Sequence, residues 1–169
     1  MTERTLVILR HAKADRPEGV RDADRPLTER GHADAAAAGV WLRREHYRPD
    51  LVICSPARRT RQTWHGVAGA LADPDGRCEI PVHYERDAYE GGTADLLRLL
   101  RGAPATAHTV LVVGHNPTVS LLSGLLDPDA PADSDGLRTS GLAVHRVPAA
   151  WAELDVAGAP LRATHTARG

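Results

Sequence analysis

Apolar and polar positions along this chain of 169 residues alternate between short, unbroken apolar runs and longer stretches with helical spacing. The apolar runs at residues 5–9, 51–54 and 109–113 are rich in valine, isoleucine and leucine, which is typical of buried strands. Strands without polar alternation are expected in a parallel sheet that is covered on both faces. Because helical segments follow these runs, the pattern predicts an α/β layered fold. No repeat or linker interrupts it, so we expect a single domain over residues 1–169.

Residues suited to helix N-termini precede three of the helical segments. Thr28 is a favourable N-cap, and Glu29 is well placed in the turn that follows. Ser55 and Asn116 each precede a proline, and we expect both to cap helices in which that proline takes the first position. The expected helices cover residues 28–46, 56–71, 93–101 and 117–126, and further strands are expected over residues 80–84, 142–147 and 151–156, the last two as a closing hairpin.

Two charged, proline-containing segments, residues 15–26 and 127–136, lack periodicity and are expected to be loops. Both could border a functional site and influence which substrate it accepts. Their composition leaves that role open.

The composition disfavours several broad classes of protein. The formal net charge is only −1, so the chain has no overall field that would attract nucleic acid or an anionic membrane. No apolar stretch approaches the roughly 18 residues of a membrane span, and the N-terminus lacks the pattern of a signal peptide, so the cytoplasm is the expected compartment. The two cysteines are too few for a disulfide framework, and Cys54 is expected in the core.

Residues that bind or transfer phosphate follow each of the three apolar runs. Arg10 and His11 come directly after the first run. Arg59 follows the second run, and His115 follows the third. The carboxyl ends of parallel strands meet at one edge of a sheet, where ligands usually bind. We therefore expect these two arginines and two histidines to surround one crevice.

These residue types fit phosphoryl transfer. A neutral imidazole is a competent nucleophile when its other nitrogen is held as a donor, and neighbouring guanidinium groups disfavour the imidazolium form of His11. Guanidinium forks match phosphoryl oxygens, and a preorganised donor such as His115 stabilises their charge. The expected phosphate-binding residues are Arg10, Arg59, His115, Ser55 and Asn116, the last two at helix starts that favour anions.

Four segments resemble motifs of the histidine phosphatase superfamily, and in particular its short bacterial phosphohistidine phosphatase branch. They are the run Leu-Arg-His-Ala-Lys-Ala at residues 9–14, Arg-Pro-Leu-Thr with Gly within residues 24–31, Ser-Pro-Ala-Arg-Arg-Thr-Arg-Gln-Thr at residues 55–63 and Val-Gly-His-Asn-Pro at residues 113–117. In the second of these regions, Asp22 matches the aspartate of the family. The resemblance implies a phosphohistidine intermediate on the first histidine, a three-layer α/β/α sandwich of the phosphoglycerate mutase-like type with a mostly parallel sheet, and no required metal.

The sequence departs from the pattern of the superfamily at two places. Ala12 replaces the usual glycine after His11. Many members also place a proton-donating carboxylate between the second arginine motif and the last histidine. Glu90 fits that spacing best, with Glu85 and Asp87 as alternatives, or the chain has no such acid.

The predicted activity is that of a phosphatase using His11 as nucleophile, with protein phosphohistidine as its substrate. Imidazole leaves more readily than an alcohol, so phosphohistidine suits a site with a weak general acid. A phosphatase for small esters or phosphosugars and a noncatalytic phosphate-binding regulator remain alternatives. A metallohydrolase is disfavoured because the nine histidines form no His-x-His or His-Glu-x-x-His pattern, so neither metal nor cofactor is expected. The oligomeric state is left open.

Overall fold

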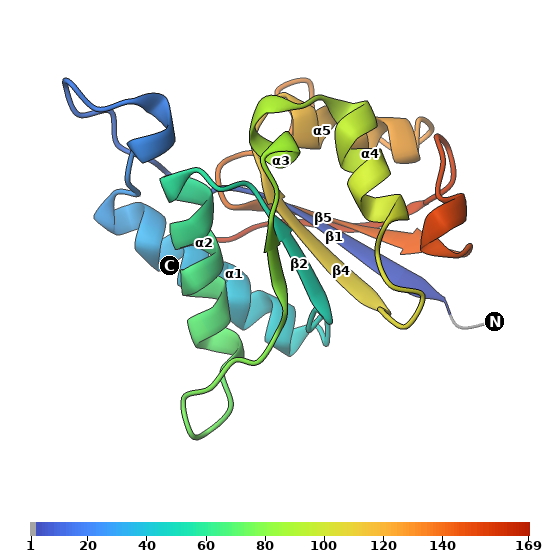
Figure 1. The fold of residues 1–169 in the computed structure, drawn as a ribbon, viewed down its shortest axis with the longest axis horizontal. Helices are drawn as coiled ribbons and strands as arrows, with labels where there is room; N and C mark the ends of the chain where they lie inside the picture. The colour runs from blue at the N-terminus through green and yellow to red at the C-terminus, as the bar shows by residue number, and fades with distance from the viewer. Residues whose placement is uncertain (1–2) are drawn as a thin grey trace.

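The computed structural model describes residues 3–169, which form one sheet with helices packed on both faces (Figure 1). The three-layer α/β/α architecture and the mostly parallel sheet predicted from the sequence are confirmed. The strands are β1 (Arg4–Arg10), β2 (Leu51–Cys54), β3 (Val82–Tyr84), β4 (Thr109–Gly114), β5 (Gly141–Val147) and β6 (Leu161–Thr166); the helices are α1 (Glu29–Arg44), α2 (Arg58–Leu71), α3 (Asp87–Glu90), α4 (Thr93–Arg101) and α5 (Thr118–Leu126); and two short 3-10 helices are η1 (Asp22–Asp24) and η2 (Trp151–Glu153).

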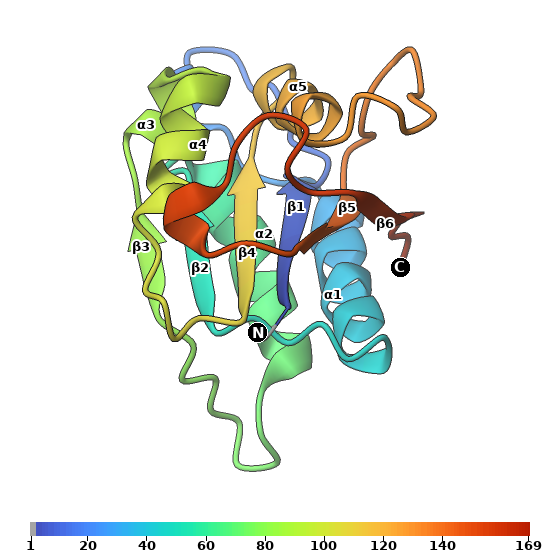
Figure 2. The ribbon, with the colours of Figure 1, turned by 90° about the vertical axis from the view of Figure 1, so that its right-hand side faces the viewer.

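The sheet has the strand order β3-β2-β4-β1-β5-β6, and its first four strands are mutually parallel. Figure 2 shows β1 and β4 running side by side in the same direction. Their register pairs Arg10 with Gly114, and the register of β2 with β4 pairs Cys54 with Val113. The carboxyl ends of three strands therefore meet at one edge of the sheet, as the sequence predicts.

Alternate residues of β1 enter two hydrophobic clusters on opposite faces of the sheet. Leu6 and Ile8 pack with residues of α4 and α5, whereas Val7 and Leu9 pack with residues of α1 and α2. All four side chains are fully buried. Because both faces of the strand are covered, its sequence is continuously apolar rather than alternating.

The predicted cap at Thr28 is confirmed, since its hydroxyl oxygen accepts a hydrogen bond from the amide of Gly31 at 3.0 Å. The predicted cap at Ser55 is wrong, because α2 begins at Arg58 and its N-cap is Ala57. The Ser55 hydroxyl instead accepts from the Ala57 amide at 3.2 Å, which forms a tight turn before the helix.

The predicted cap at Asn116 is also wrong. Helix α5 begins at Thr118 with Pro117 as its N-cap residue, and no side chain caps it. The amide nitrogen of Asn116 donates to the carbonyl oxygen of Leu137 at 2.8 Å, so this side chain bonds the loop that precedes β5 instead of the helix.

The closing hairpin exists, but its second strand is Leu161–Thr166 rather than residues 151–156. Trp151 begins the 3-10 helix η2, and its side chain is buried in the hydrophobic cluster that also contains residues of α4 and α5. Its indole nitrogen donates to the carbonyl oxygen of Ala107 at 2.7 Å. A buried aromatic side chain with a polar partner, instead of strand pairing, explains the apolar character of this segment.

No helix within residues 3–169 has both the length and the apolar character needed to cross a membrane.

The start of α1 packs against the segment that follows β1. The amide of Thr28 donates to the carbonyl oxygen of Lys13 at 3.0 Å. A Cβ atom added at Gly31 would lie 2.1 Å from the same oxygen and 3.2 Å from the Cβ of Leu27. Only a residue without a side chain allows this approach, so Gly31 fixes the position of α1 relative to the end of β1.

Gly31→Ala is therefore expected to lower the free energy of unfolding by about 1–3 kcal/mol, the usual cost of overpacking. Gly69→Ala is the matched control at an exposed position of α2, where nothing lies within 4 Å of an added Cβ. It is expected to raise the free energy of unfolding by about 0.5–1 kcal/mol, because alanine favours the helix. Urea denaturation measures both, and equal effects of the two substitutions would contradict the close packing at Gly31.

Candidate active site

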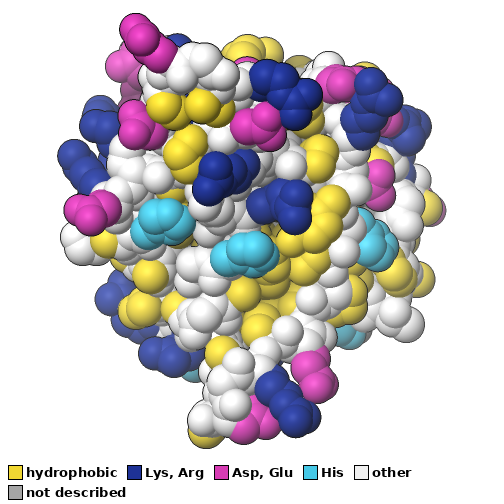
Figure 3. Space-filling view, turned by 60° about the vertical axis from the view of Figure 1, so that its left-hand side comes forward, with side chains coloured by type: hydrophobic (Ala, Val, Ile, Leu, Met, Phe, Trp, Pro, Cys, Tyr) yellow, Lys and Arg dark blue, Asp and Glu magenta, His cyan; other side chains and the backbone are white. Residues whose placement is uncertain are grey.

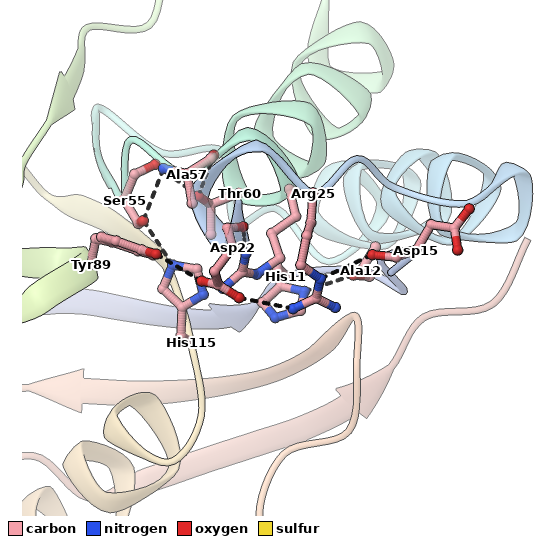
Figure 4. A network of polar contacts seen from close by, with 11 residues as sticks. His11, Ala12, Asp15, Asp22, Arg25, Ser55, Ala57, Thr60, Tyr89 and His115 are labelled. Carbon is pink, nitrogen blue, oxygen red and sulfur yellow. Dashed lines mark hydrogen bonds and ion pairs between the residues drawn. The ribbon is translucent and has the colours of Figure 1, made fainter. Parts of the chain in front are cut away.

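Two histidines and two arginines lie together at the carboxyl edge of the sheet, as the sequence predicts: Arg10, His11 and His115 stand at or just after the ends of β1 and β4, and Arg59 is at the start of α2. The amide of His11 donates to the carbonyl oxygen of Gly114 at 3.0 Å, which extends the pairing of β1 with β4. The rings of His11 and His115 have centroids 5.3 Å apart. Figure 4 shows both rings in one polar network that also receives side chains from α2 and from the loop after β1.

His11 is held in one tautomer by the backbone. Its side chain is only 9% exposed, and its Nδ1 lies 2.7 Å from the carbonyl oxygen of Ala12. A carbonyl oxygen only accepts, so Nδ1 carries the proton and Nε2 carries the lone pair. Ala12 itself is fully buried, and its amide donates to the Thr63 hydroxyl at 3.0 Å, so the methyl group that replaces the usual glycine is accommodated.

The pocket keeps His11 uncharged. Burial lowers the pKa of His11 to about 4, and the guanidinium groups of Arg59 and Arg10 act in the same direction. The hydrogen bond to Ala12 opposes this shift without cancelling it. At neutral pH the ring therefore has a free lone pair on Nε2.

His115 is also neutral and contacts the turn before α2. Its Nε2 lies 2.7 Å from the Ser55 hydroxyl oxygen. Burial, followed by the neighbouring His11 and Arg59, lowers the pKa of His115 to about 3. When the Ser55 hydroxyl donates to Nε2, the ring proton is on Nδ1, which is buried without a hydrogen-bond partner among the described residues. This N–H is then available to a ligand oxygen.

The two arginines are anchored by backbone carbonyl groups. Arg59, which is 6% exposed, donates from Nη1 to the carbonyl oxygen of Asp22 at 2.7 Å. Arg10 donates from Nη1 to the carbonyl oxygen of Leu137 at 3.1 Å, and burial lowers its pKa. The Nε atoms of both arginines are buried and have no partner among the described residues. Two fixed cations with unused donors suit an anionic ligand.

The other predicted binding residues, Ser55 and Asn116, also reach the cluster, although not as helix caps. Ser55 contacts His115, as described above. The Leu137 carbonyl oxygen that accepts from Arg10 also accepts from the Asn116 amide at 2.8 Å. Asn116 therefore helps to hold the loop that anchors Arg10.

The three candidate acids, Glu85, Asp87 and Glu90, lie outside the hydrogen-bond network of the two histidines. Glu90 accepts a hydrogen bond from Arg86 Nε at 2.9 Å on the surface of the protein. Asp87 pairs with Arg98 of α4. Glu85 is half-buried, and its backbone amide donates to the carbonyl oxygen of Cys54 at 3.0 Å. No hydrogen bond or ion pair within residues 3–169 joins any of these carboxylates to either ring of the cluster.

The carboxylate that does enter the cluster is Asp22. It accepts from Arg59 at 3.0 Å, from Arg25 at 3.1 Å and from the Tyr89 hydroxyl at 2.7 Å. The ring of Tyr89 meets His115 edge-on, with centroids 5.4 Å apart. The resemblance to the family includes Asp22 without giving it a role, and no motif marks Tyr89, the neighbour of Glu90. The signal was the Arg-Pro-Leu-Thr motif, which marks the loop with Asp22 and Arg25 as part of the site.

Within residues 3–169, no three histidine, cysteine or acidic side chains come together as a set that could hold a metal ion. The donors in the cluster are guanidinium groups and neutral rings, which fit an anion better than a cation. On the face drawn in Figure 3, basic and acidic side chains are interspersed.

Comparison with known proteins gives concordant matches. The model of the histidine phosphatase superfamily (branch 1) matches residues 6–90. A protein of Mycobacterium tuberculosis without a characterised activity is 35% identical over 167 residues, covering 95% of this chain and all of that protein. Among solved structures, a candidate phosphohistidine phosphatase SixA from Nakamurella multipartitia is 37% identical with a TM-score of 0.84, covering 99% and 98% of the two chains. Its counterpart from Agrobacterium tumefaciens is 30% identical with a TM-score of 0.75, covering 96% and 97%.

The histidine pKa values predict a pH response. His11 and His115 are expected to stay neutral from pH 8 down to about pH 5, because their pKa values are lowered to about 4 and about 3. Nitrogen-15 NMR of the imidazole rings, assigned with His11→Gln and His115→Gln, measures this directly. Protonation of either ring near the ordinary value of about 6.5 would contradict the burial argument.

The lowered pKa values of His11 and His115 also predict how the free energy of unfolding changes in acid. Below pH 6.5 the unfolded chain binds protons that the folded chain does not, so the free energy of unfolding is expected to fall as the pH drops from about 6.5 toward 3. His11→Gln is expected to flatten that slope, which urea denaturation at a series of pH values checks.

Proposed function

The chain belongs to the histidine phosphatase superfamily, and we propose that it hydrolyses phosphoryl groups through a covalent intermediate on His11. The observation that carries the proposal is the bond from His11 Nδ1 to the Ala12 carbonyl oxygen, which leaves Nε2 with a lone pair in a cationic pocket. The roles below follow from this geometry and from the chemistry of phosphoryl transfer.

In the first step, Nε2 of His11 attacks phosphorus, and the bond from phosphorus to the leaving group breaks. Arg10 and Arg59 neutralise the charge on the phosphoryl oxygens, and His115 donates a hydrogen bond from Nδ1–H to one of them. The His11 ring becomes a phosphorylated imidazolium, whose positive charge is balanced by the phosphoryl group. Contacts outside residues 15–26 hold His11, Arg10 and His115 in place before substrate arrives, so these three groups need little reorganisation in the transition state.

In the second step, water attacks the phosphorus atom of the intermediate. The bond from phosphorus to Nε2 breaks, inorganic phosphate leaves, and His11 returns to the neutral form. The low pKa of His11 helps here, because the ring leaves readily as a neutral imidazole.

We propose protein phosphohistidine as the substrate. An alkyl ester needs an enzyme acid to protonate its leaving oxygen, whereas phosphohistidine protonated on its second ring nitrogen leaves as neutral imidazole. Of the carboxylates near the pocket, Glu90 is paired with Arg86, and hydrogen bonds from Tyr89, Arg59 and Arg25 hold the pKa of Asp22 far below its usual range. Neither is therefore arranged as a proton donor, which supports a substrate that brings its own proton.

The relatives support the same substrate. The Nakamurella and Agrobacterium structures, 37% and 30% identical to this chain, are candidate phosphohistidine phosphatases. A phosphoglycerate mutase of Methylobacterium radiotolerans matches only 56% of the chain, at 36% identity. We further propose that the enzyme acts as a single domain in the cytoplasm, without metal or cofactor.

His11→Ala is expected to lower turnover of a phosphohistidine-bearing protein by about a thousandfold or more, because the covalent route is lost. Wild-type protein mixed with labelled substrate is expected to acquire acid-labile phosphate at position 11. His65→Ala, at an exposed position of α2, is the control and is expected to behave like wild type.

Each alternative has its own result in this assay. Faster turnover of an aryl phosphate or a panel of sugar phosphates than of phosphohistidine would contradict phosphohistidine as the substrate. Full activity of His11→Ala would contradict His11 as the nucleophile. Binding of phosphate without turnover of any substrate would favour the noncatalytic regulator.

A further inference from the structure

Asp22 occupies the donors of the proposed phosphoryl pocket. Its side-chain Oδ2 accepts from Arg59 Nη2 at 3.0 Å, and its backbone carbonyl oxygen accepts from Arg59 Nη1 at 2.7 Å. Both terminal nitrogens of Arg59 are therefore bonded to a single residue. Figure 4 shows the carboxylate of Asp22 between Tyr89 and Arg25, with a hydrogen bond to each.

A carboxylate in this position resembles part of a phosphoryl group. Both are anions whose oxygens accept from guanidinium forks, and both favour the same bidentate geometry. The three donor groups of Arg59, Arg25 and Tyr89 converge on the Asp22 carboxylate. When a phosphoryl group contacts Arg59, the Asp22 carboxylate repels it and competes for the same nitrogens.

The segment that carries Asp22 is closed at its base by a backbone hydrogen bond, and polar contacts of Asp22 hold its tip. We call residues 15–26 the strap. Its ends are joined by the amide of Asp15, which donates to the Pro26 carbonyl oxygen at 2.8 Å. Its tip has no buried residue in η1, and the Asp22 side chain is 55% exposed. Figure 1 shows the strap, in blue, standing out from the body beyond α1 and α2. Polar contacts that an anion can replace therefore hold the tip down.

We propose that Asp22 is an internal competitor of the phosphoryl group: in the free enzyme it holds Arg59, Arg25 and Tyr89, and a bound phosphoryl group displaces it and takes over these donors. This inference rests on the proposed function, since it assumes that the pocket binds phosphate. It adds Arg25 and Tyr89 to the phosphoryl-binding residues and makes the strap a segment that opens when substrate binds.

Two other roles for Asp22 fit the geometry less well. As a general acid it would have to carry a proton, but its donors hold the pKa of its carboxyl far below the usual range. As a fixed support for Arg59 it would remain beside the phosphoryl group, and two anions would then share one guanidinium and repel each other. Displacement avoids that repulsion.

The test is calorimetric titration of inorganic phosphate into wild type, Asp22→Asn and Asp24→Asn. Asparagine keeps the shape of Asp22 and removes its charge, so Asp22→Asn is expected to bind phosphate roughly tenfold more tightly, within the usual range of coupled sites. Asp24 is the matched control, because it lies on the same turn and pairs with Arg21 instead of the pocket. Its variant is expected to bind like wild type.

Weaker or unchanged binding by Asp22→Asn would overturn the inference, because a supporting residue weakens binding when removed and an uninvolved one does not change it. Arg25→Gln is expected to weaken binding severalfold, and unchanged affinity would remove Arg25 from the proposed donors.

Hydrogen exchange of wild-type protein gives a second readout that needs no variant. Phosphate is expected to speed amide exchange in the strap, because it releases the tip. Slower exchange with phosphate would mean that the strap closes over the ligand, which contradicts displacement. If Asp22→Asn does not fold, this measurement decides alone.

The results separate the inference from the proposed function. Tighter phosphate binding by Asp22→Asn without phosphorylation of His11 would keep the inference and reject the covalent mechanism. Phosphorylation of His11 with weaker binding by Asp22→Asn would do the reverse. Phosphate that binds neither protein would contradict both.

Discussion

The Nδ1–H of His11 donates to the carbonyl oxygen of Ala12 at 2.7 Å, and the chemistry of the pocket depends on this bond. It fixes the tautomer, so the second nitrogen has a lone pair. Burial and two neighbouring guanidinium groups keep the ring uncharged and lower its pKa to about 4. A cationic pocket thus contains a neutral nucleophile, and the same charges that attract a phosphoryl group prevent protonation of the atom proposed to attack it.

The sheet makes this arrangement possible. Strands β1, β2 and β4 are parallel and in register at their carboxyl ends, so residues distant in sequence meet at one edge. The strands are covered on both faces, which makes this edge rigid, and loops and helix starts supply the remaining groups. Asp22 and Tyr89 come from such segments. Asp22 accepts hydrogen bonds from both Arg59 and Tyr89, and these bonds connect the strap to the pocket.

The sequence predicts the regular elements well where the local pattern is strong. Strand β2 and helix α4 have the bounds expected from their apolar runs, and the cap at Thr28 is as predicted. The four residues of the cluster were predictable because each follows a buried strand. The prediction fails where a distant partner overrides the local preference. Asn116 is expected to cap a helix but donates to the Leu137 carbonyl oxygen. Trp151 is expected to begin a strand, but its indole nitrogen donates to the Ala107 carbonyl oxygen in the core. The bond from Tyr89 to Asp22 spans 67 residues, so no local pattern could reveal it.

The atom proposed to receive the phosphoryl group is Nε2 of His11. A crystal structure of the protein with vanadate, which adopts the geometry of the transferred phosphoryl group, tests it most directly. We expect a bond from vanadium to Nε2 of His11, with the vanadate oxygens within hydrogen-bond distance of Arg10, Arg59 and His115. Vanadium bonded to another side chain, or an anion held without a bond to His11 while Nε2 takes the proton, would contradict it.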